Sequence, residues 1–276
     1  MIVNEFQRLV YEPSEMTLAN SKGLRLWLDA YASRDSRSVR ELIVSYLSGE
    51  TIPECLDMID PDKREEVDEL LDWFVGELRI APMTDLISEL KHKRYALVES
   101  VDNVPQLSSL EASTEAIVDV LAMSETPLTY IRLGYHLYGA GENRNEVAKR
   151  KYGENAAKFA AILGLVRLGR DIQDPVSPNR IGVELTSVGK AFARAKGDRM
   201  DIAARLLLKS ALFRDLIASE DDECARVFWE VVSLLAPETR LRRTSAFSAM
   251  LGLYLRYGGV LGEGSHAEEL LCRMRR

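Results

Sequence analysis

Apolar residues recur along most of the chain at spacings of three and four residues, the period of an amphipathic helix. In the first ninety residues, four such stretches begin near Asn20 or Ser21, Ser36 or Ser38, Pro61 and Pro82. Serine is a common N-cap, and proline is well tolerated in the first helical turn. The pattern therefore predicts a helical N-terminal domain over residues 1–100.

Residues 102–109 interrupt this pattern with Pro105 and two serines, which predicts a linker. Helical period then returns, with one helix capped by Ser113 or Thr114 and the next starting at Thr126. Gly153 predicts a turn that divides the following stretch into two helices, Glu146–Tyr152 and Glu154–Leu163.

Two short apolar segments follow, residues 165–168 and 181–185, separated by a loop that contains Pro175 and Pro178. They predict a pair of strands, after which Thr186 or Ser187 caps a helix that runs to Ala195. Helix, helix, helix, strand, loop, strand is the order of a winged helix-turn-helix, in which the loop between the strands is the wing.

The C-terminal part is helical by the same criterion, with helices expected at 200–217, 225–235 and 245–257. Their broad apolar stripes suit the domain's own core and equally a homodimer interface. The predicted fold is thus mainly α, with an acidic helical N-terminal domain (1–100), a winged helix-turn-helix with a two-stranded wing (110–196) and a C-terminal helical extension (197–276).

The net charge of −7 over 276 residues argues against a nucleic-acid partner only as long as it is taken as an average. By segment it is −9 in residues 1–110, −4 in 111–143, +7 in 144–215 and −1 in 216–276. The positive block coincides with the predicted helix pair and wing, which favours an anionic partner such as double-stranded DNA. A solvated, lysine- and arginine-rich helix surface is the alternative interpretation.

In a helix-turn-helix the second helix of the pair enters the major groove. Asn155 and Lys158 are expected to face outward there, where Asn can read adenine and Lys can reach guanine or phosphate. Basic side chains around the pair, on the wing and at the start of the last helix are the candidates for phosphate contacts. They are Arg144, Lys149, Arg150, Lys151, Arg167, Arg170, Arg180, Arg242 and Arg243.

Several short motifs resemble a bacterial winged-helix module found beside or fused to restriction and phage-defence proteins. The matching stretches are Val101-Asp-Asn-Val-Pro105, Glu115-Ala-Ile117, Phe159-Ala-Ala-Ile-Leu-Gly-Leu165, Glu184-Leu-Thr-Ser-Val-Gly-Lys190, Leu212-Phe213 and Arg242-Arg-Thr-Ser245. The resemblance covers about residues 100–258 and implies a DNA-binding role in such a system. Lys151-Tyr152-Gly153 stands where the module has Arg-Gln and paired tyrosines.

Catalytic and cofactor motifs are few. Asp62 with Glu89 and Lys91 has the residue types of a metal-dependent nuclease, although a solvated helix face explains them more simply. His-Glu-x-x-His, Cys-x-x-Cys and phosphate-loop patterns are absent from the sequence, so neither a metal nor a cofactor is expected. Three separated cysteines indicate a reducing, cytoplasmic location, and no apolar run reaches membrane-spanning length.

We therefore expect a non-enzymatic DNA-binding accessory or regulatory protein of a restriction or phage-defence system. One alternative is a protein-interaction adaptor whose acidic N-terminal domain docks a nuclease or helicase partner. The other alternative is a metal-dependent nuclease.

Overall fold

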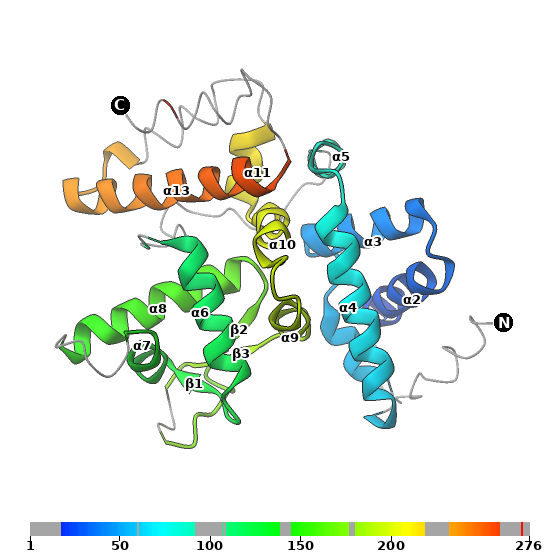
Figure 1. Cartoon of the computed structure of the whole chain (residues 1–276), viewed down its shortest axis with the longest axis horizontal. Helices are drawn as coiled ribbons and strands as arrows, with labels where there is room; N and C mark the ends of the chain where they lie inside the picture. Colours follow the sequence, from blue (N-terminus) through cyan, green and yellow to red (C-terminus); the bar gives the residue numbers. More distant parts are fainter. Residues whose placement is uncertain are drawn as a thin grey trace.

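The computed structural model describes residues 18–59, 61–91, 107, 109–138, 145–176, 180–218, 232–259 and 272. Within these ranges the chain is mainly helical, with one small antiparallel sheet (Figure 1). The N-terminal helices are α2 (Leu18–Ser33), α3 (Ser36–Ser48), α4 (Arg64–Ile80) and α5 (Met83–Leu90), with the short 3-10 helices η1 (Pro53–Met58) and η2 (Pro61–Lys63).

An aromatic cluster joins three of these helices. The ring of Phe74 on α4 lies 4.5 Å from that of Trp27 on α2 and 5.2 Å from that of Tyr46 on α3, measured between centroids. All three side chains are buried, and the Trp27 indole donates a hydrogen bond to Thr51 Oγ1 at 3.3 Å. The donor finds a partner, so the whole indole can be buried without an unsatisfied polar group.

The helices expected in this region are confirmed, with adjusted ends. Helix α3 starts at Ser36, but its N-cap is Asp35, whose carboxylate accepts hydrogen bonds from the Arg37 and Ser38 amides. Helix α2 starts at Leu18, before the expected caps. The sequence pattern did not predict η1, because a 3-10 turn is too short to show a period.

The middle of the chain contains α6 (Leu110–Ala122), β1 (Leu128–Thr129), α7 (Tyr130–Tyr138), α8 (Glu146–Ile162), β2 (Val166–Gly169) and β3 (Gly182–Leu185). The strand order is β1-β3-β2, with both pairs antiparallel and with Leu128 opposite Val183. The two predicted strands are confirmed, whereas β1 was not foreseen.

Two helix boundaries expected in this region were wrong. Ser113 and Thr114 are not caps but buried residues inside α6, where the Thr114 hydroxyl donates to the carbonyl of Leu110. Gly153 is not a turn: residues 146–162 form one continuous helix, so the expected pair Glu146–Tyr152 and Glu154–Leu163 does not exist.

The C-terminal helices are α9 (Ser187–Arg194), α10 (Arg199–Leu206), α11 (Ala211–Ala218) and α13 (Pro237–Tyr257), with η4 (Leu207–Lys209) between α10 and α11. Thr186 caps α9 as predicted. The single helix expected at 200–217 is broken at Ser210, which is extended and accepts a hydrogen bond from the amide of Phe213. Helix α13 starts at Pro237, two turns before the expected Ser245.

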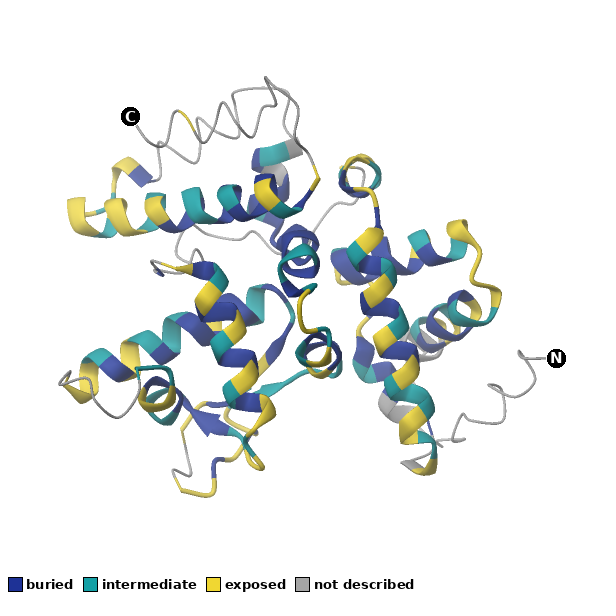
Figure 2. Ribbon diagram, viewed as in Figure 1, coloured by how far each residue is buried: buried dark blue, intermediate teal, exposed yellow. Residues whose placement is uncertain are grey.

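Buried apolar residues form one continuous cluster from Leu24 to Leu255. Helices α9 and α10 lie between α4 and α6, and the buried sides of the helices face this shared interior (Figures 1 and 2). The apolar stripes of α10, α11 and α13 are used within this core. Most of the predicted linker, residues 102–106 and 108, lies outside the described residues. None of the described helices is both long and apolar enough to span a bilayer.

Two cationic side chains from the C-terminal part bind backbone carbonyl groups in the last turn of α3. The ammonium of Lys209 donates to the carbonyl oxygen of Tyr46 at 3.0 Å and lies 3.8 Å from the centre of the Tyr46 ring. Arg214 is buried and donates to the carbonyl of Leu47 at 3.1 Å. The last carbonyls of a helix have no partner within it, and positive charge is favourable at that end. These contacts attach α11 and η4 to the N-terminal helices.

Burial lowers the pKa of Lys209 to about 8, with Glu54 opposing and Arg214 reinforcing the effect. From pH 8 to 10 Lys209 has lost its proton in the folded chain but still holds it in the unfolded chain. The free energy of unfolding should therefore rise with pH over this range. Above pH 10 the effect reverses, because burial raises the pKa of Tyr46 and only the unfolded tyrosine ionises.

Lys209→Met should abolish the rise in stability between pH 8 and 10, as measured by urea unfolding at a series of pH values. Lys22→Met, at an exposed position of α2, is the matched control. A rise of the same size in the Lys209→Met variant would contradict the assignment to Lys209.

Candidate nucleic-acid interface

Helices α7 and α8 cross at two glycines. A Cβ atom on Gly134 would collide with the carbonyl oxygen of Lys149, and one on Gly153 would collide with the carbonyl oxygen of Tyr130. Each glycine therefore allows its helix backbone to approach the other helix more closely than any side chain would permit. Gly153, where the sequence pattern predicted a turn, is therefore a packing residue in the middle of α8.

The continuous α8 exposes a single stripe of polar side chains. Asn145 caps its start by accepting a hydrogen bond from the amide of Ala148 at 2.8 Å. The spacing of 151, 155 and 158 is that of one helix face, and residue 150 lies about 100° around the helix axis from residue 151. Arg150, Lys151 and Lys158 are exposed and Asn155 is half-buried, whereas Ala156, Phe159 and Ala160 are buried.

The cationic side chains of α8 differ in whether they have an ion-pair partner. Lys158 forms an ion pair with Glu154 at 2.6 Å. The side chains of Arg150 and Lys151 have no hydrogen bond or ion pair with any residue that the structure describes. They are therefore the two cations of α8 that remain free to contact an anion.

Lys149 differs from the expectation for a phosphate contact. It is only 8% exposed, and its ammonium lies 4.4 Å from the centre of the Tyr135 ring on α7. A cation over an aromatic face is held by the ring quadrupole. Lys149 thus helps to hold α8 against α7, and little of its side chain is accessible from outside.

The three expected wing arginines are also not equivalent. On β2, Arg167 donates to Glu184 at 2.6 Å and to Asp171 at 2.7 Å, and the hydrogen bond that it donates to Glu184 is the main reason that the pKa of Arg167 is raised. Arg170 and Arg180 are exposed and make no hydrogen bond or ion pair within the described part of the chain. Residues 177–179, in the loop between the strands, lie outside the description.

A buried carboxylate lies at the base of this loop, where the sequence pattern gave no indication of one. Asp174 accepts hydrogen bonds from the amides of Thr129 and Val176, at 3.1 and 2.9 Å, and from the guanidinium of Arg132. Burial alone would raise the pKa of Asp174, but these donors lower it overall. The carboxylate joins the loop to β1 and α7, and a lone Asp beside a proline gives no sequence signal of such a role.

The remaining candidates belong to other helices than α8 or fall outside the described residues. Arg144 falls among the residues that the structure leaves undescribed. Arg242 and Arg243 belong to the first turns of α13, where Arg242 lies 3.9 Å from Glu238. Of the nuclease candidates, Glu89 pairs with Arg40 at 3.5 Å. Within the described ranges, no three His, Cys, Asp or Glu side chains are placed to share a metal ion.

Comparisons of this chain with protein-family models, with curated proteins and with solved structures find no match. The chemistry of the exposed side chains and their surroundings therefore carries the functional proposal.

The Gly153→Ala variant should lose about 3 kcal/mol of unfolding free energy, because the added methyl group must separate α7 from α8. Gly76→Ala on α4 is the matched control: its Cβ would meet nothing within 4 Å, and the helix should gain about 0.5–1 kcal/mol. Urea unfolding followed by circular dichroism measures both changes. Equal stability of the two variants would refute the close helix crossing.

Proposed function

We propose that residues 110–194 form a winged helix-turn-helix unit that binds duplex DNA through α8. The element order α6, β1, α7, α8, β2, β3 and the antiparallel order β1-β3-β2 support this proposal. In this assignment α7 and α8 are the helix pair, with α8 as the recognition helix and the loop between β2 and β3 as the wing.

The observation that carries the proposal is the exposed stripe of α8, with its unpaired Arg150 and Lys151. A helix of 17 residues is about 25 Å long, and the major groove of about 12 Å width admits a helix along this length. Side chains on the stripe would then reach both the backbone and the base edges.

The side chains divide into two roles under this proposal. Arg150 and Lys151, with Arg170 and Arg180 of the wing, contact phosphates and set the position of the protein. Asn155 is the base-reading candidate, because its amide can bond adenine in a bidentate manner. Lys158 reaches the DNA by exchanging its Glu154 partner for a phosphate or a guanine.

The biological setting that we propose is an accessory or regulatory role in a bacterial restriction or phage-defence system, without catalysis by this chain. The motif resemblance over residues 100–258 supports it. The protein would act in the cytoplasm, alone or as a homodimer, with a protein partner of the same system.

Arg150→Gln/Lys151→Gln should weaken binding to duplexes of any sequence. Because each phosphate contact contributes about 0.9 to the slope of log K against log salt, the slope should become shallower by about 2. Fluorescence anisotropy over a salt series measures both quantities. Lys22→Gln/Arg25→Gln removes the same charge from exposed positions of α2 and should change neither. If the wild-type protein binds no duplex even at low salt, the proposal fails.

Asn155→Ala should affect sequence discrimination more than general affinity. Loss of a bidentate contact to adenine should remove about 1–3 kcal/mol of preference at one position of the selected site. Selection from a random duplex library, repeated with the variant, identifies the position. An unchanged site preference would exclude Asn155 as a base-reading residue.

A further inference from the structure

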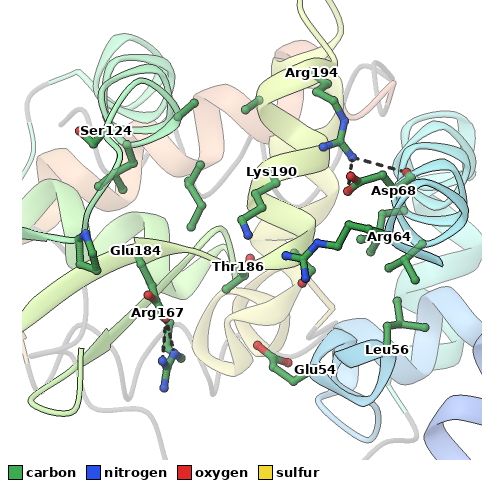
Figure 3. Close-up of a pocket in the computed structure, with 18 of the residues that line it drawn as sticks. Glu54, Leu56, Arg64, Asp68, Ser124, Arg167, Glu184, Thr186, Lys190 and Arg194 are labelled. Carbon is green, nitrogen blue, oxygen red and sulfur yellow. Dashed lines mark hydrogen bonds and ion pairs between the residues drawn. The ribbon is translucent and has the colours of Figure 1, made fainter. Parts of the chain in front are cut away.

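A cleft of about 970 Å³ lies on a different part of the molecule, and none of its lining residues belongs to α8 (Figure 3). One wall comes from η1 and α4, including Glu54, Arg64 and Asp68. The other comes from the end of α6, the sheet and α9, including Lys190 and Arg194. The volume is within the usual range for sites that bind small molecules.

Most of the charged side chains in the cleft neutralise one another. Arg194 is 2.7 Å from Asp72 and 3.2 Å from Asp68 across the junction of α9 and α4. Arg167 is 2.6 Å from Glu184. Each of these arginines contacts two carboxylates, since Arg167 also lies 2.7 Å from Asp171, so neither offers an excess of positive charge to a ligand.

Arg64 and Lys190 are the exception. Arg64 is the first residue of α4 and Lys190 lies in the first turn of α9, so they belong to opposite walls. Their side chains point into the cleft and toward one another (Figure 3). Neither side chain has a hydrogen bond or ion pair with any residue in the described ranges. Two like charges that face each other repel unless an anion lies between them.

Two carboxylates also line the cleft, but neither forms an ion pair with Arg64 or Lys190. The charge of Glu54 acts on the buried Lys209, whose pKa it raises against the effect of burial. Glu125 is exposed in the turn that follows α6. Arg64 and Lys190 are therefore the two cations of the lining that have no carboxylate partner among the described residues.

We propose that this cleft binds a small molecule that carries a phosphate group. A phosphate has three terminal oxygens and up to two negative charges, so it can accept charge-assisted hydrogen bonds from both walls at once. Thr126 and Ser187 add hydroxyl groups to the lining. The volume leaves room beside the phosphate for an organic group, such as the remainder of a nucleotide.

Isothermal titration calorimetry tests the proposal. Pyrophosphate is titrated as the probe into the full chain in a low-salt buffer. The wild-type protein should bind with a saturable isotherm. Arg64→Gln/Lys190→Gln should lower the affinity by about tenfold or more, because it removes two charge-assisted contacts. Arg150→Gln/Lys151→Gln should bind pyrophosphate as the wild type does, so a failure of DNA binding and a failure of this site remain distinguishable.

Titrations with other ligands identify the class of ligand that the cleft binds. Tighter binding of adenosine monophosphate than of inorganic phosphate would support a nucleotide, and equal binding would support the phosphate group alone. If malonate competes as well as pyrophosphate, the site is not specific for phosphate and the proposal is overturned. Absence of pyrophosphate binding up to about 10 mM, or unchanged binding in Arg64→Gln/Lys190→Gln, also overturns it. Should the double variant unfold, Lys190→Gln alone gives the same test at an exposed position.

Discussion

The close crossing of α7 and α8 determines the geometry of the central part of the chain. Gly134 and Gly153 each face a backbone carbonyl of the opposite helix, so neither position tolerates a side chain without movement of a helix. The crossing fixes which face of α8 is buried, and therefore which face presents Arg150, Lys151, Asn155 and Lys158. Lys149 contributes from the same contact, since its ammonium rests on the Tyr135 ring of α7.

The positive charge of residues 144–215 has a second explanation that composition alone does not reveal. Several of its arginines attach one part of the fold to another. Arg194 pairs with Asp68 and Asp72, Arg199 pairs with Asp119 at 2.8 Å, and Arg205 donates to the carbonyls of Ala81 and Tyr257. Much of the +7 is therefore structural, and the surface available to an anion is reduced to a few exposed cations. The proposed DNA binding thus depends on the arrangement of these exposed cations along α8 and not on the net charge of the segment.

Sequence periodicity predicted the helices with long apolar stripes, such as α3 and α4, because burial of one face imposes the pattern directly. Periodicity failed to predict the local structure where one residue type is compatible with two different structures. A glycine in a polar stretch indicates a turn or a close helix contact equally well, and only the position of α7 decides between them at Gly153. Arg64 and Lys190 could not have been found, since residues far apart in sequence become neighbours only when α4 and α9 pack together. Asn155 and Lys158 were expected to face outward, and on α8 the first is half-buried and the second is exposed.

Lysine acetylation footprinting, with and without saturating duplex DNA, tests the central claim that α8 forms the DNA-binding surface. Duplex DNA should protect Lys151 and Lys158 from acetylation, while Lys22 on α2 and Lys196 after α9 should keep their reactivity. Protection of Lys22 or Lys196 with full reactivity of Lys151 and Lys158 would contradict it, because the DNA would then lie on another face of the molecule.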